Sequence, residues 1–123
     1  MAVKLSNRAY DYARRLIDER RVALDDRDAW SEHQPSTREE NEFIAEHGWD
    51  EYGRWHLGVD DERPRDTKGH YKFPYGDFQD VHRCAILSAE SRAAQRKYED
   101  IKSAVAHLHG TLEALRRERS RAR

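Results

Sequence analysis

The sequence predicts an all-α fold, a three- or four-helix bundle with an irregular aromatic-rich segment packed across it. Apolar residues recur three and four positions apart in several stretches, which is the spacing of one face of a helix. No stretch alternates apolar and polar residues for long enough to indicate a sheet. The 123 residues suit a single domain, so we expect residues 1–123 to share one core.

The first helix is expected over residues 6–29. Ser6 or Asn7 supplies the N-cap, because either side chain accepts a hydrogen bond from a free backbone N–H of the first turn. Pro35 lies beyond the end of this helix and prevents it from continuing. The apolar stripe of the helix consists of Tyr10, Ala13, Ile17 and Leu24.

A second helix is expected over residues 36–47. Ser36 and Glu39 match a capping box, in which each side chain accepts a hydrogen bond from the backbone N–H of the other residue. Gly48 ends the helix, because glycine adopts the left-handed C-terminal conformation without strain. Residues 48–76 are expected to be irregular, since few of them follow a helical pattern.

Two further helices are expected over residues 77–97 and 100–118. Asp77 is the expected N-cap of the first. The second has apolar residues at alternating spacings of four and three, a seam that would allow self-association or contact with a protein partner. A basic tail, residues 116–123, ends the chain. The seam consists of Ile101, Val105, Leu108, Leu112 and Leu115.

Charge is segregated along the chain, although the net charge is only −1. Residues 1–24 and 83–123 are basic, whereas residues 25–82 contain most of the acidic side chains. Unlike charges attract at short range, so we expect the acidic middle to pack against the basic ends. The sequence has no apolar run of membrane-spanning length and no signal-peptide pattern, which favours a cytoplasmic protein without a membrane partner.

Residues 43–84 contain eight of the twelve aromatic residues, five of the six glycines and the only cysteine. Large rings beside glycine form either an irregular core or a pocket. Basic and imidazole side chains border several of the rings, a combination that suits a small anionic or planar ligand. The predicted ligand-binding residues are Arg54, Trp55, His56, Tyr71, Lys72, His82 and Arg83.

Seven histidines raise the question of a metal site. A helical site needs ligands three or four residues apart, so that they share one face. His82 and Cys84 are two apart, which places them about 200° apart around the helix expected there. Scattered surface or hydrogen-bonded histidines are therefore the favoured interpretation, and we predict no metal ligand and no cofactor. Convergence through the fold would involve His47, His56, His70 and His82.

The predicted function is non-catalytic binding of a ligand or a protein partner through residues 47–84. An alternative is a small enzyme that uses Cys84 or a pocket of histidine and arginine. Cys84 is expected on the inner side of a helix, where cysteine usually acts as a small buried apolar residue rather than a nucleophile. Ser88 and Ser91 lack the glycine pattern of a nucleophile elbow. We therefore predict no catalytic residue.

Association with nucleic acid is a further alternative. Basic side chains gather at the end of the last expected helix and on the helix before it, where they could contact phosphates. The acidic middle of the chain argues against a broad basic surface. The residues concerned are Arg92, Arg96, Lys97, Arg116, Arg117, Arg119, Arg121 and Arg123.

A motif in the C-terminal half resembles one found in other proteins. It reads Tyr71-Lys72-Phe73-Pro74-Tyr75-Gly76-Asp77-Phe78, then Val81-His82-Arg83, Ala89-Glu90-Ser91-Arg92-Ala93-Ala94-Gln95 and Asp100-Ile101. This pattern is similar to that of a family of small bacterial proteins, actinobacterial ones among them, with no established activity. The resemblance implies a small folded domain and assigns no functional residue.

Overall fold

The computed structural model describes residues 3–121 and combines helices with two small sheets. The prediction of an all-α bundle is therefore wrong. Residues 122 and 123, at the end of the predicted basic tail, lie outside the described part of the chain. The elements are β1 (Val3–Leu5), α1 (Asn7–Asp18), β2 (Val22–Ala23), α2 (Trp30–His33), α3 (Thr37–Gly53), β3 (His56–Asp60), η1 (Lys68–His70), β4 (Tyr71–Pro74), β5 (Val81–His82), α4 (Arg83–Arg96) and α5 (Glu99–Arg121).

Both sheets are built from very short strands. The larger sheet is antiparallel, with the order β1-β3-β4, and the smaller one pairs β2 with β5 in parallel. Residues 48–76, expected to be irregular, thus contain β3 and β4. Strands of two to five residues are too short to show a reliable alternation, and pairs such as Val3 with Asp60 join residues far apart in the sequence.

The first helix is shorter than expected, because α1 ends at Asp18 rather than near residue 29. Arg20 adopts a left-handed backbone conformation with φ of 64°, which stops the helix. The carbonyl of Arg21 then accepts a hydrogen bond from the backbone N–H of Val81 at 3.0 Å. Val22 and Ala23 then form β2, and Leu24, the last residue of the predicted helical stripe, follows that strand.

The second expected helix is present, with the predicted capping box between Ser36 and Glu39. It does not stop at residue 47. Gly48, with φ of 85° and ψ of 172°, introduces a kink, after which the chain resumes a helical path to Gly53. A residue with a Cβ would be strained at this φ, so glycine allows α3 to change direction here.

The third expected helix begins six residues later than predicted, at Arg83 instead of Asp77. The Asp77 carboxylate caps a turn: its Oδ1 accepts the backbone N–H groups of Gln79 and Asp80, at 3.0 and 2.8 Å. Phe78 lies within this turn, with φ of 72°. His82, which precedes α4 directly, therefore lies in β5 and not within a helix.

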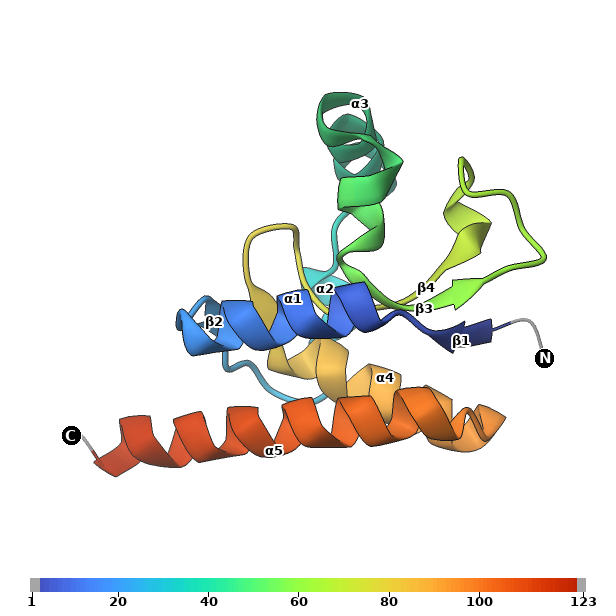
Figure 1. Cartoon of the computed structure of the whole chain (residues 1–123). Helices are drawn as coiled ribbons and strands as arrows, with labels where there is room; N and C mark the ends of the chain where they lie inside the picture. The colour runs from blue at the N-terminus through green and yellow to red at the C-terminus, as the bar shows by residue number, and fades with distance from the viewer. Residues whose placement is uncertain (1–2, 122–123) are drawn as a thin grey trace.

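The core lies where α5 packs against α4 and α1 (Figure 1). The five predicted seam residues of α5 are all buried, four of them with no exposed surface. They pack inside the chain's own core, so they are not available for self-association or for a partner. Figure 1 also shows α3 standing away from the layer formed by α1, α4 and α5.

Part of the aromatic segment closes this core. Trp55 and Tyr75 stack with their ring centroids 5.5 Å apart, and the Tyr75 hydroxyl donates a hydrogen bond to the Arg54 carbonyl at 2.7 Å. Gly76 permits this arrangement, because a Cβ at that position would lie 2.6 Å from Trp55 Cζ3. Within residues 3–121, no helix combines the length and apolar character required to cross a membrane.

Replacing Leu108 by alanine should destabilise the protein by about 2 to 5 kcal/mol, because Leu108 is fully buried and the truncation leaves a cavity. Urea unfolding measures the change. Ser103→Ala, at an exposed position of the same helix, is the control and should change the stability by less than about 0.5 kcal/mol. Equal effects of the two substitutions would contradict the assignment of this face of α5 to the core.

Candidate metal centre

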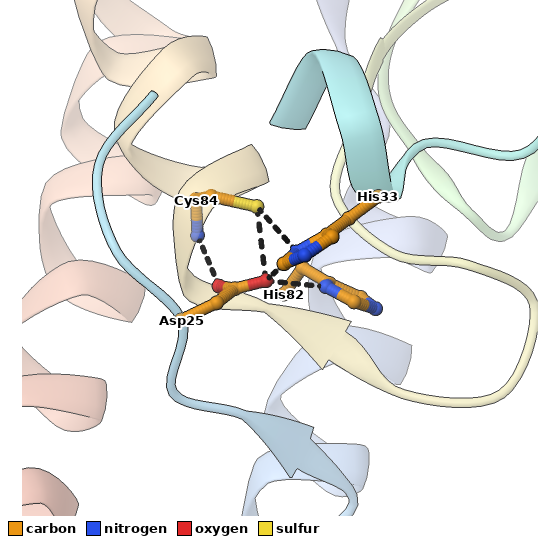
Figure 2. Close-up of side chains that lie close together, drawn as sticks. All are labelled: Asp25, His33, His82 and Cys84. Carbon is orange, nitrogen blue, oxygen red and sulfur yellow. Dashed lines mark hydrogen bonds and ion pairs between the residues drawn. The ribbon is translucent and has the colours of Figure 1, made fainter. Parts of the chain in front are cut away.

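Four side chains with metal-binding atoms converge beside the start of α4 (Figure 2). One donor atom from each of these residues lies within 4.8 Å of the corresponding atom of every other. His82 and Cys84 are buried, while the cluster reaches the surface at His33. The cluster consists of Asp25, His33, His82 and Cys84, and is called the Asp25 cluster below.

Pairing of β2 with β5 creates the cluster. In this parallel pair Val22 lies opposite Val81, and Ala23 lies opposite His82. Asp25 follows β2 by two residues, and Cys84 follows β5 by two, so both arrive at the same end of the small sheet. Residues almost sixty positions apart are therefore brought into contact.

Helix α2 adds the fourth donor. Trp30 at its start is buried, and its ring lies 5.9 Å from the ring of His82. His33 is the last residue of α2, before the chain turns away at Gln34 and Pro35. The packing of Trp30 thus places the His33 ring 5.6 Å from that of His82.

The Asp25 carboxylate is the centre of a hydrogen-bond network (Figure 2). Its Oδ2 lies 2.7 Å from Nδ1 of His33, 2.7 Å from Nδ1 of His82 and 3.1 Å from Sγ of Cys84. Its Oδ1 accepts the backbone N–H of Cys84 at 2.8 Å. Asp25 therefore caps the N-terminus of α4, where a negative charge is favourable.

These contacts change the acidities of the groups. Burial raises the pKa of Asp25, but hydrogen bonds from Cys84, His82 and His33 outweigh it and lower the pKa to about 2. Burial and the hydrogen bond to Asp25 raise the pKa of Cys84 to about 12. For His82, burial acts downwards, while Asp77 and Asp25 give a net rise in pKa. Without a cation, Cys84 is therefore a thiol and a poor nucleophile.

The donor set suits a divalent zinc-like ion. Zinc binds thiolate, imidazole and carboxylate groups at about 2.0 to 2.3 Å, usually with four ligands in a tetrahedron. Such bond lengths separate neighbouring ligand atoms by about 3.3 to 3.8 Å. The Sγ of Cys84 lies 3.9 Å from Nδ1 of His33, close to this range. The shorter contacts of Asp25 Oδ2 require its carboxylate to move outward by about half an ångström.

Outer contacts orient these donors. The Nε2 of His82 lies 2.9 Å from Oδ2 of Asp77, the carboxylate-to-histidine contact that commonly supports a metal-bound imidazole. Arg83 donates to the Asp25 carbonyl at 3.0 Å through Nη1, and to Glu113 Oε1 at 2.6 Å through Nε. The position of Asp25 is thus linked to α5.

A cavity of about 530 Å³ adjoins the cluster on the side of Cys84 and Trp30. One wall follows a single face of α4, with Ser88 and Ser91 beyond Cys84. Such a volume is within the range of small-molecule sites. No donor of the cluster other than Cys84 lines this cavity.

The structure separates most of the seven residues predicted to bind a ligand. Trp55 is a core residue, and Arg54 lies over the ring of Tyr12 at 5.5 Å. Buried His56 donates through Nδ1 to the Tyr52 carbonyl at 2.9 Å.

The other predicted residues lie in three places. Tyr71 lines a cavity of about 260 Å³, and Lys72 lines a separate cavity of about 320 Å³. His82 and Arg83 meet at the Asp25 cluster. The rings of His56 and Tyr71 also lie near one another, with centroids 6.0 Å apart, away from that cluster. Binding of a ligand or partner through residues 47–84 stays a prediction.

Sequence reasoning missed this cluster for a specific reason. The objection to His82 and Cys84 as joint ligands assumed that both lie in one helix, whereas α4 begins between them at Arg83. Asp25 was not a candidate, because it was expected within the first helix. His33 was not among the four histidines considered for convergence. A His-x-Cys pair at the junction of a strand and a helix was the available signal.

The four histidines considered for convergence do not converge. Nδ1 of His70 donates to the Arg63 carbonyl at 2.9 Å, and the exposed His47 packs against Phe43.

No family model, curated protein or solved structure matches the chain. The geometry of the cluster therefore carries the functional argument by itself.

His56→Asn should reduce the loss of stability in acid. Burial lowers the pKa of His56 to about 4 in the folded protein, against about 6.5 in the unfolded chain. The unfolded state therefore takes up the proton first, and stability is lost as the pH falls from about 6.5 to about 4, by up to about 3 kcal/mol. Asparagine retains a donor towards Tyr52 but does not titrate.

Urea unfolding at several pH values, with a chelator in every sample, measures this effect without a contribution from bound metal. His47→Asn, at an exposed site, is the matched control and should leave the pH dependence unchanged. An unchanged pH profile for His56→Asn would show that another group causes the acid sensitivity.

Proposed function

We propose that the protein binds a divalent zinc-like ion through Asp25, His33, His82 and Cys84. The single observation that supports this most strongly is the convergence of one carboxylate, two imidazoles and one thiol, all within 4.8 Å. A thiolate with imidazole ligands favours zinc over magnesium or calcium, which prefer oxygen ligands. Thiolate and carboxylate together contribute two negative charges, which balance the charge of the ion.

The ion would act mainly on the stability of the fold. Its ligands come from the segment after β2, the end of α2, β5 and the start of α4. Four protein ligands fill a tetrahedral ion, which is typical of a structural site rather than a catalytic one. A single ion would therefore join segments whose own strands are only two residues long.

Zinc should bind the chelator-treated protein with a Kd below about 1 μM and raise its thermal midpoint, because the folded state alone presents the four donors together. Cys84→Ser retains a hydrogen-bond donor to Asp25 but loses the thiolate, so it should weaken zinc binding by at least about tenfold. Competition with a chromogenic chelator gives the Kd, and calorimetry gives the midpoint.

The control for the zinc experiment is His47→Ala, which removes an exposed histidine outside the cluster. It should bind zinc like the parent protein. Cobalt provides a second measurement: the parent protein should show thiolate-to-cobalt charge transfer and strong tetrahedral d–d bands, both lost in Cys84→Ser. Zinc binding that is equally strong in Cys84→Ser would refute this site.

Glu113→Ala should lower zinc affinity by about tenfold although Glu113 is not a ligand. It removes the partner of Arg83, which also donates to the Asp25 carbonyl, so Asp25 is positioned less well. Glu113→Gln retains an oxygen acceptor and should restore part of the affinity. Chelator competition and the cobalt spectrum provide the measurements.

Glu118→Ala is the matched control for Glu113. Glu118 lies on the same helix in an exposed ion pair with Arg20 at 3.8 Å, so its removal should alter zinc affinity by less than about twofold. A Glu113→Ala protein with lower thermal stability but unchanged affinity would show that the contact serves only to hold α5 in place.

A further inference from the structure

A cavity of about 320 Å³ lies between the larger sheet and the C-terminal end of α4. All three strands of the sheet contribute a residue to its lining, and α4 contributes two basic residues four positions apart, on one face of the helix. The cavity is lined by Val3, Asp60, Lys72, Phe73, Arg92, Arg96 and Tyr98.

The charge around this cavity is not balanced by the protein. Lys72, Arg92 and Arg96 carry three positive charges, against one negative charge on Asp60. Across residues 3–121, none of these three cations lies within 4.0 Å of a carboxylate oxygen, although ten other lysine or arginine side chains do. The lining therefore has a net charge of +2.

Asp60 is already engaged elsewhere. Its Oδ1 accepts the backbone N–H of Glu62 at 3.0 Å, and its Oδ2 lies 4.0 Å from Nε of Arg63. Arg63 does not line the cavity. Asp60 is thus a partial counter-charge for the three cations.

Arg92 and Arg96 also repel one another. The Arg92 side chain is exposed overall, but desolvation by the surrounding protein lowers the pKa of its guanidinium group, and the charge of Arg96 lowers it further. The C-terminal end of α4 carries a partial negative charge of about one half, which is too small to balance the charges of Arg92 and Arg96 beside it. An anion in the cavity would relieve this repulsion.

The cavity has an aromatic wall as well. The guanidinium carbon of Arg92 lies 5.6 Å from the ring centroid of Phe73, and the ring of Tyr98 meets Phe73 edge to face at 6.0 Å. A guanidinium over a ring keeps its N–H groups free at the edge. Phe73 is nearly fully buried with φ of 60°, an uncommon backbone conformation for phenylalanine.

We propose that this cavity binds a small dianion of the phosphate-monoester class, through Lys72, Arg92 and Arg96. Guanidinium groups bind phosphate oxygens in pairs, and Lys72 adds a point charge. The net charge of +2 matches a dianion better than a carboxylate, and the volume admits a small molecule. The rings of Phe73 and Tyr98 favour an ester with an apolar or aromatic group. None of the three cations is a donor of the Asp25 cluster, although Arg92 also lines the cavity that adjoins the cluster.

Calorimetric titration with phenyl phosphate tests the proposal, in the presence of a chelator so that no metal contributes. We expect saturable binding with a Kd below about 1 mM, and weaker binding of benzoate, which has the ring but one charge. Arg96→Gln and Lys72→Gln should each raise the Kd by about tenfold. Lys102→Gln, an exposed site on α5 with the same change in net charge, should leave it within about twofold.

Three results would overturn this inference. The first is the absence of saturable phenyl phosphate binding to the folded parent protein. The second is an equal loss of binding in Lys102→Gln, which would indicate a diffuse charge effect. The third is much tighter binding of a short single-stranded oligonucleotide with the same sensitivity to Arg96→Gln, which would assign the site to nucleic acid. None of these results bears on zinc binding.

Discussion

The parallel pairing of β2 with β5 is the constraint on which the rest of the structure depends. It consists of two residue pairs, and a pair of such short strands would not be stable without support. Support comes from the Asp25 carboxylate, which accepts the backbone N–H of Cys84 and so caps α4 from a distant segment. The sheet places Asp25 at the start of α4, and Asp25 in turn stabilises the sheet and the helix together.

This arrangement extends to the core through Arg83. Arg83 contacts both the carbonyl of Asp25 and the carboxylate of Glu113, and α5 buries five apolar residues, from Ile101 to Leu115, in the core. Helix α4 is therefore held in place both by the polar contacts at its start and by the apolar packing of α5 against it. A shift of Asp25 would therefore move Arg83 and its partner Glu113 on α5, without any change in the apolar core.

The Asp25 cluster has two physical descriptions that differ in what balances the carboxylate. In one, protons on two imidazoles and a thiol surround a single oxygen atom. In the other, one divalent ion replaces those protons, and the same donors turn their lone pairs towards it. The two descriptions share every outer contact, including that of Asp77 with His82. A cation adds attraction between segments that hydrogen bonds already bring together.

The sequence by itself determined the features that depend on near neighbours. The capping box at Ser36 follows from residues three positions apart, and the buried face of α5 follows from its four-three spacing. The interruption at Gly48 was also visible, because glycine tolerates a positive φ, although the continuation of α3 was not.

Only the tertiary structure decided the strands, the start of α4 and the Asp25 cluster. Two-residue strands form because a partner nearly sixty residues away is held beside them, and no local pattern records such a partner. Asp77 and His82 could each have preceded a helix, and the pairing of β5 fixed the choice. Asp25 and His33 became candidate ligands for the same reason: their proximity to Cys84 is a property of long-range packing and not of spacing along the chain.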